Sequence, residues 1–207
     1  MKDFEILDTK GSWLDVLNTC RSTVSKKFLT KEPSEEFKRA IIMSEHSPIR
    51  TKLIKWVWRN LPYWVSTHFA RHHIGFEKWI STQRNDRQEC YDREKAPQDA
   101  PVIFVGEGNT QALINMSKVR LCFTASKATR DKMVELKKGI KEVDKTTAWG
   151  MVPSCIYRGG CPEKGLGVKC DFYKKFLERH PEITASTTLE ERYDIYYEEF
   201  FGEKFHV

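Results

Sequence analysis

The chain has 207 residues, of which 40% are hydrophobic and 31% charged, which is enough apolar material for one folded domain and excludes a wholly disordered protein. A formal charge of +6 favours a phosphate-bearing ligand, but the basic residues are spread along the chain, which disfavours nucleic acid as the partner. No apolar run approaches the ~20 residues of a membrane span, and the N-terminus lacks an apolar signal segment. We therefore expect a cytoplasmic protein with no membrane partner, in which the six cysteines are reduced.

Short strands and amphipathic helices alternate in the first part of the chain. A strand is predicted over residues 4–7, and a helix is predicted to begin at 33–36, where acidic residues occupy the first turn. Residues 51–59 carry apolar side chains with a period of two, which predicts a second strand. Pro62 then opens a helix, because its missing N–H costs least in the first turn. The apolar stripe expected on this helix consists of Leu61, Trp64, Val65, Phe69 and His72.

The second part of the chain continues this alternation. Residues 84–101 are polar and contain prolines, which predicts a loop, and 101–105 form a short buried strand that 106–109 would end. The segment 153–169 is predicted to be irregular, and 189–201 helical. Helices alternating with a few strands predict an α/β or α+β fold. The helical region between these segments has an apolar stripe of Met133, Leu136, Ile140 and Val143.

A cationic cluster is predicted at the end of the helix that Pro62 opens. Arg71, His72 and His73 are consecutive, Ser81 follows after seven residues, and Arg84 lies just beyond. The planar guanidinium group of Arg matches phosphate, and His donates or accepts a hydrogen bond at neutral pH. The pattern indicates an anion site. The structural alternative is a basic helix end stabilised by the helix dipole.

A second cluster consists of Asn109, Asn115 and Arg120. Eleven helical residues come within about 20° of three full turns, so Asn109 and Arg120 would face the same way, and Asn115 about 120° from them. An amide and a guanidinium group facing one cleft suit a nucleotide base and its phosphate. The alternative is a helix cap at Asn109 followed by a surface arginine.

The spacing of these residues resembles that of the flavin-dependent thymidylate synthases. Their signature is Arg-His-Arg, seven residues and Ser, and Arg71-His72-His73 followed by Ser81 resembles it with one substitution. The family also has a Glu-His ahead of a strand, with the His twenty-five residues before the signature. His46 stands at that interval before Arg71.

A later motif of the same family is also similar. Asn109, Asn115 and Arg120 reproduce its intervals of six and five residues, and Ser25 resembles an early Ser on the flavin side. The resemblance covers roughly residues 1–145. It implies a mixed sheet flanked by helices, formed by residues 1–150. Residues 151–207 would add a Cys-containing loop and a C-terminal helix packed on that domain.

The resemblance also implies a chemistry. Family members use FAD, reduce it with NADPH, and transfer a one-carbon unit from methylenetetrahydrofolate to C5 of dUMP as homotetramers. Arg120 is the implied catalytic residue, because its charge would favour the ionised pyrimidine ring. Implied cofactor-binding residues are Ser25, His46, Arg71, His72, His73, Asn109 and Asn115. Implied nucleotide-binding residues are His68, Arg71, Ser81, Gln83, Arg84 and Arg120, with His68, His73 and Gln83 replacing a family Gln, Arg and Arg.

Two other functions fit the sequence. On the same scaffold, a pyrimidine hydroxymethylase would trap the folate carbon with water. A different class is a basic nucleic-acid-binding module with a metal site, because aromatic and basic residues are interleaved over 52–78. Cys155, Cys161 and Cys170 are its candidate ligands, with Cys122 or a His as the fourth. The alternative for these cysteines is a set of buried thiols in a compact loop.

Overall fold

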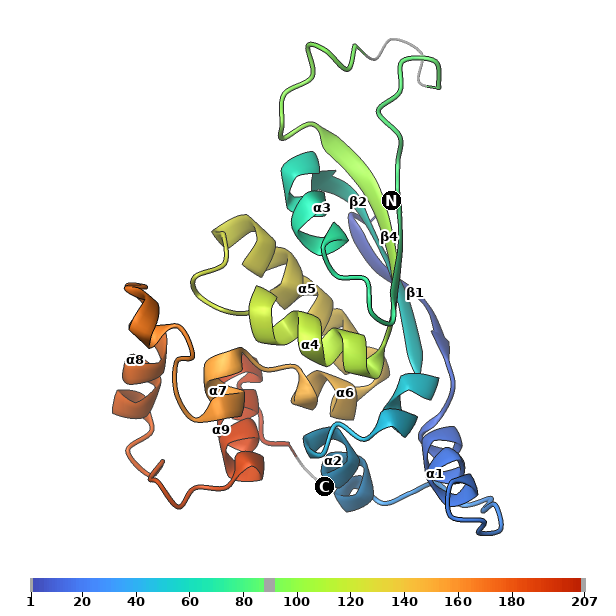
Figure 1. Cartoon of the computed structure of the whole chain (residues 1–207), viewed down its shortest axis with the longest axis vertical. Helices are drawn as coiled ribbons and strands as arrows, with labels where there is room; N and C mark the ends of the chain where they lie inside the picture. The colour runs from blue at the N-terminus through green and yellow to red at the C-terminus, as the bar shows by residue number, and fades with distance from the viewer. Residues whose placement is uncertain (1, 88–91, 206–207) are drawn as a thin grey trace.

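The computed structural model describes residues 2–87 and 92–205 and is built on a four-stranded sheet (Figure 1). The strand order is β1-β2-β4-β3, and each of the pairings is antiparallel. The predicted α+β class is confirmed, although the described strands form an antiparallel sheet and not a mixed one. The strands are β1 (Phe4–Lys10), β2 (Leu53–Pro62), β3 (Phe76–Ile80) and β4 (Pro101–Asn109).

Helices cover one face of the sheet and continue beyond its end (Figure 1). Polar side chains cap several of them, among them Ser34, Asn109, Ser126 and Thr188, each of which accepts a hydrogen bond from a backbone N–H of the first turn. The α-helices are α1 (Trp13–Ser22), α2 (Glu35–Met43), α3 (Tyr63–Ala70), α4 (Thr110–Arg120), α5 (Lys127–Val143), α6 (Lys145–Gly150), α7 (Ser154–Arg158), α8 (Phe172–Arg179) and α9 (Leu189–Phe201). Two 3₁₀ helices, η1 (Ser47–Thr51) and η2 (Lys164–Leu166), complete the described elements.

One core lies between the sheet and helices α3, α4 and α5. Trp56 and Trp58 of β2 are fully buried there, and Trp56 stacks on Phe76 with a ring separation of 5.5 Å. Within the described part of the chain, no helix covers the opposite face of the sheet (Figure 1). There Trp79 is 52% exposed and Ile103 48% exposed, so apolar surface remains open to solvent.

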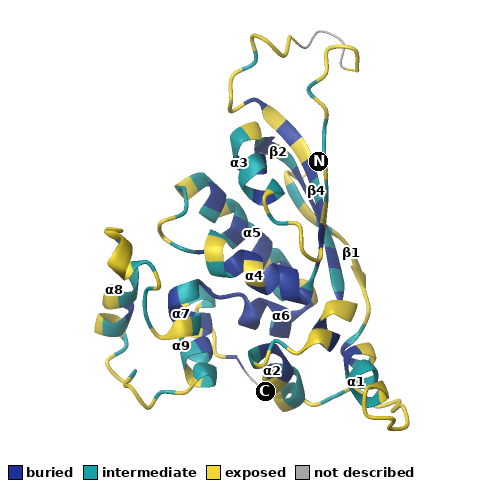
Figure 2. Ribbon diagram, in the orientation of Figure 1, coloured by how far each residue is buried: buried dark blue, intermediate teal, exposed yellow. Residues whose placement is uncertain are grey.

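A second core lies below the sheet, where α1, α2, α6, α7, α8 and α9 meet. Helix α4 belongs to both cores: Leu113 and Met116 pack in the first and Ile114 in the second. Most of α4 is therefore buried (Figure 2). Its last residue, Arg120, projects from the buried helix into the region of the predicted site.

Several predicted elements are confirmed. The helix over 189–201 has the predicted bounds, the helix at 33–36 begins after its Ser34 cap, and β2 covers most of 51–59. Strand β4, however, continues through the glycines that were expected to end it. A Cβ on Gly106 would lie 2.5 Å from the Trp56 ring, so this glycine makes room for packing and does not form a turn.

Other elements differ from the sequence prediction. Helix α3 ends at Ala70, so His72 lies beyond it, and Val143 is 47% exposed and lies outside the core. The segment 153–169 contains the short helix α7, and neither β3 nor α8 was predicted. No helix in the described ranges is long and apolar enough to cross a membrane.

Candidate functional site

Arg120 is the centre of the candidate site. Its Nε–H donates to His72 Nε2 at 2.9 Å, and its Nη2–H donates to the backbone carbonyl of His68 at 2.7 Å. Both acceptors are neutral, and no carboxylate of the described residues forms an ion pair with Arg120. Burial and the charge of Arg71 lower the pKa of Arg120, but a guanidinium group keeps its proton at neutral pH. The site therefore holds a half-buried positive charge with no anionic partner from the described chain.

His72 is the neutral partner of Arg120 in the segment after α3. Because Arg120 donates to its Nε2, this nitrogen carries no proton, and the proton of the neutral ring is on Nδ1. Burial, and then the charges of Arg120 and Lys78, lower the pKa of His72 to about 4. Lys78 also donates to the backbone carbonyl of His72 at 2.8 Å, which ties the segment to β3.

His68 lies in the last turn of α3 and faces α5. Its Nδ1 lies 2.8 Å from the Oγ1 atom of Thr129, and its ring packs edge-on against Trp64. Burial, and then the charges of Arg120 and Arg71, lower the pKa of His68. The two histidines next to Arg120 are thus both favoured as neutral rings.

Arg71 and His73 complete the cationic cluster predicted from the sequence. Both side chains are exposed, and His73 Nδ1 lies 3.0 Å from the carbonyl oxygen of Arg71. No described residue forms an ion pair with Arg71. The structure thus brings His68, Arg71, His72 and Arg120 together, with His73 next to them.

Asn109 lies at the junction of β4 and α4. Its Oδ1 accepts from the backbone N–H of Ala112 at 2.9 Å, so the carboxamide caps α4, as the structural alternative expected. Its backbone N–H donates to the carbonyl of Gly75, and a Cβ on Gly75 would lie 2.3 Å from the Asn109 carboxamide. The positive φ of Gly75 and this close approach both require glycine. The cap therefore fixes the loop that follows the cationic cluster.

Glu45, the residue before His46, joins a second polar group that includes Asn115. The Glu45 carboxylate accepts from Gln111 Nε2 at 2.6 Å and forms an ion pair with Lys118, both on α4. Gln111 also donates to Asn115 Oδ1 at 3.4 Å. His46 and Asn115 themselves are exposed. Asn115 is part of α4, the helix that carries Arg120, and His46 follows Glu45 in sequence. Among the described residues, neither side chain forms a hydrogen bond with that arginine.

The residues after β3 have local partners. Ser81 extends the pairing of β3 and β4, because its N–H donates to the Ile103 carbonyl at 2.8 Å and its Oγ accepts from the Ile103 N–H at 3.0 Å. The Ser81 hydroxyl keeps a proton to donate. Arg84 forms two hydrogen bonds to Asp86, at 2.9 and 2.6 Å. Gln83 is half-buried between them.

Ser25 is not brought to the rest of the site. It is exposed in the connection between α1 and α2, at the end of the molecule opposite the loop after β3 (Figure 1). Its φ of 55° is in the left-handed region, which marks a turn. Its place in a flavin site stays a prediction from the resemblance.

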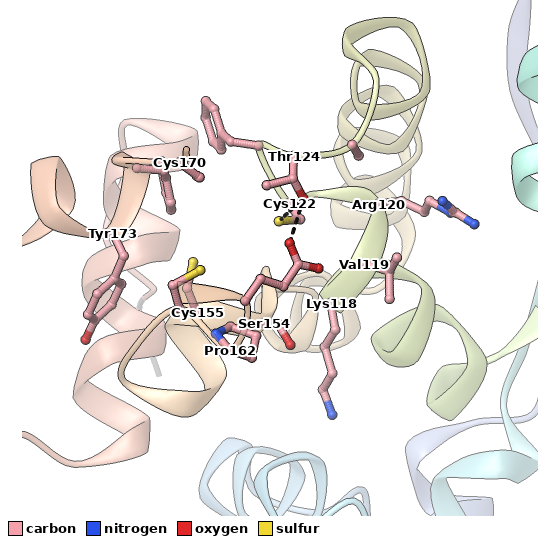
Figure 3. A pocket seen from close by; sticks show the side chains of 15 residues that line it. Lys118, Val119, Arg120, Cys122, Thr124, Ser154, Cys155, Pro162, Cys170 and Tyr173 are labelled. Atoms are coloured by element: carbon pink, nitrogen blue, oxygen red, sulfur yellow. Dashed lines mark hydrogen bonds between the residues drawn. The ribbon is translucent and has the colours of Figure 1, made fainter. Parts of the chain in front are cut away.

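The candidate metal ligands line a cavity. Cys122, Cys155, Cys161 and Cys170 surround a volume of about 250 Å³ between the end of α4 and helices α7 and α8. Figure 3 shows the Arg120 side chain pointing away from this cavity. Burial raises the pKa of the Cys155 thiol to about 12.

The described residues hold no group of three or more His, Cys, Asp or Glu side chains arranged to bind a metal ion. The thiols of the described cysteines are free, without disulfides. Cys90 lies outside the described residues. Metal binding by Cys155, Cys161 and Cys170 stays a prediction from the sequence.

Sequence reasoning missed two groups of site residues. Ser126 and Thr129 support His68 from α5, and Gln111 and Lys118 bind Glu45 from α4. The first group has a signal in the sequence, because a Ser before an amphipathic helix is a typical cap. The second group has none, since neither Gln nor Lys indicates which distant carboxylate it contacts.

Comparisons with known proteins add a likeness of fold. No protein-family model matches the chain, and no curated protein matches it. Among 107 matching chains of solved structures is the crystal structure of a UMP/dUMP methylase, PolB from Streptomyces cacaoi, bound with 5-Br dUMP. The TM-score is 0.57 and the identity 11%, over 71% of this chain and 93% of that one. At this identity the match shows a shared fold.

Proposed function

We propose that this chain transfers a one-carbon unit from methylenetetrahydrofolate to C5 of dUMP, with FAD as cofactor and NADPH as reductant. The observation that carries the proposal is Arg120, a half-buried guanidinium group held by two neutral acceptors and without a carboxylate partner among the described residues. Such a group is ready for an anionic ligand. The UMP/dUMP methylase of the same fold supports a pyrimidine nucleotide as that ligand.

Arg120 suits an ionised pyrimidine ring. The ring becomes nucleophilic at C5 when N3 loses its proton and negative charge spreads over the ring oxygens. Two of the Arg120 donors are engaged by His72 and His68, so the guanidinium plane is fixed and its other N–H groups remain for the ligand. A fixed charge in a partly dry site stabilises the developing anion without reorganisation.

The donors near Arg120 also fit the phosphates of a flavin dinucleotide. Arg71 and His73 are exposed, and no described carboxylate neutralises Arg71. When bound, FAD would supply the redox chemistry of the methyl-forming reaction. The chain itself would contribute the positive charges of Arg71 and Arg120. The Asn109 cap would hold the adjacent loop in place beside them.

Titration with FAD and dUMP tests this proposal. We expect purified protein to bind FAD, and the double variant Arg71→Ala, His73→Ala to bind it at least tenfold more weakly, because each lost charged hydrogen bond typically contributes ~1.5–3 kcal/mol. The exposed Arg158→Ala is the matched control. Flavin fluorescence measures the affinity, and an unchanged affinity in the double variant would contradict the assignment.

Release of tritium from C5-labelled dUMP measures turnover. Mass spectrometry of the product separates a methyl from a hydroxymethyl group, and hence the synthase from the hydroxymethylase.

We also propose a homotetramer. The support is the open face of the sheet, where exposed Trp79 and Ile103 form apolar surface, with Lys55 Nζ 5.3 Å from the centre of the Trp79 ring. Light scattering should give a mass four times that of the chain. Trp79→Glu should lower this mass, because it places a charge in the contact, whereas the same change at exposed Val24 should not. A monomeric wild-type protein would refute the assembly.

A further inference from the structure

The hydrogen bonds around His68 have a defined direction. Ser126 caps α5, and its Oγ accepts from the backbone N–H of Thr129 at 3.4 Å. The Ser126 hydroxyl proton is donated to Thr129 Oγ1 at 2.7 Å. A hydroxyl group has a single proton. Since Thr129 Oγ1 receives the proton of Ser126, its own proton is left for the next acceptor along the chain of bonds.

That acceptor is His68. The distance from Thr129 Oγ1 to His68 Nδ1 is 2.8 Å, and Thr129 is 0% exposed, so water does not compete for the contact. When Thr129 donates to Nδ1, the proton of the neutral His68 ring must be on Nε2. Protonation of Nδ1 would take this acceptor away from the Thr129 hydroxyl proton, which is buried and cannot turn to water instead.

We propose that Ser126 and Thr129 form a hydroxyl relay that holds His68 in its neutral Nε2–H form, as a hydrogen-bond donor to the ligand of Arg120. Thr129 is thus a positioning residue for His68. On the proposed function, the acceptor is a carbonyl oxygen of the pyrimidine ring. No described residue accepts a hydrogen bond from His68 Nε2, and the edge-on Trp64 ring supports one orientation of the imidazole.

The charges around His68 favour the same state. The positive groups that act on it are Arg120 and Arg71, and both disfavour a second proton on the ring. His72, the other histidine next to Arg120, has the opposite tautomer, because its Nε2 accepts from that arginine. The site therefore offers one neutral histidine whose Nε2 is an acceptor and one whose Nε2 is a donor.

Nitrogen-15 NMR of the imidazole groups tests the relay without any ligand. In the wild-type protein, we expect the His68 signals of an Nε2–H tautomer. Thr129→Val removes the donor to Nδ1 while keeping the shape, so it should mix the tautomers and raise the pKa of His68. Thr129→Ser should restore both values. A wild-type His68 protonated on Nδ1 overturns the proposal directly, without any variant.

Binding of dUMP tests the second half of the proposal. Thr129→Val should weaken dUMP binding about five- to tenfold, the fold-change that corresponds to one net hydrogen bond of ~1 kcal/mol. Thr129→Ser should bind as the wild type does, and exposed Thr124→Val serves as the control. Altered tautomers with unaltered dUMP affinity would overturn the donor role. If the wild type binds no dUMP at all, the proposed function fails, and the NMR result still decides whether the relay exists.

Discussion

Arg120→Ala is expected to oxidise reduced flavin about 10²–10³-fold more slowly than the wild type in the presence of saturating dUMP and folate. The estimate is the usual effect of removing one donor that stabilises developing negative charge, ~2.7–4 kcal/mol. Arg120→Lys should also be impaired. Lysine keeps the charge but cannot donate to His72 and to the His68 carbonyl from one rigid plane, as Arg120 does.

Two comparisons make the Arg120 result specific. Ser81→Ala should weaken nucleotide binding more than the chemical step, because it removes a phosphate donor and not the group next to the ring. Arg158→Ala, an exposed arginine of α7, should leave the rate unchanged. If Arg120→Ala oxidises flavin at the wild-type rate, Arg120 has no role in turnover.

Lys137→Met is expected to stabilise the fold by about 1–3 kcal/mol, the cost of a buried polar group without a partner. Lys137 is 0% exposed, and its Nζ has no hydrogen-bond partner among the described residues. The Nζ lies 4.4 Å from the ring centre of Tyr196 and 4.2 Å from that of Phe200. Contact of a charged amine with such rings is worth up to ~2 kcal/mol, whereas burying the charge costs several. Burial therefore dominates and lowers the pKa of Lys137 well below its usual value.

The stability gained by Lys137→Met should depend on pH in a defined direction. The folded pKa of Lys137 lies below the unfolded value of 10.5, so the unfolded state binds more protons between these two values. Wild-type stability should therefore rise with pH through that range. The advantage of Lys137→Met should be largest near neutral pH and shrink toward about pH 10. Urea unfolding at several pH values measures it, with the exposed Lys138→Met as control. A less stable Lys137→Met would mean that the aromatic rings hold a charged amine.

Local patterns predicted the elements whose sequence periodicity reflects their own burial. Helix α9 has the predicted bounds because its cap, Thr188, and its apolar face are both local signals. The end of β4 was predicted wrongly because Gly106 is a glycine for a reason outside its own strand, the Trp56 ring packed above it. Strand β3 was missed because only Phe76 is buried along it, and the other side chains are partly or fully exposed.

The candidate site was predictable only as a set of residue types. The resemblance implied one site for Arg71, His72 and Arg120, and the structure brings the two last residues into contact. Which nitrogen of each histidine carries the proton depends on partners distant in sequence. Thr129 lies 61 residues after His68, and no local pattern connects them.

The place of α4 in both cores has a consequence for how the site moves. Leu113 and Ile114 pack in different cores, so exposing α4 requires both cores to open, and its amides should be among the slowest to exchange with solvent. Arg120 is carried by this helix. Its partner His72 belongs to the short connection before β3, which is held by hydrogen bonds from Lys78 and Asn109 and in which Ile74 is 80% exposed. The charge is therefore carried by a helix that opens only with both cores, whereas its histidine partner is held by hydrogen bonds in a partly exposed connection.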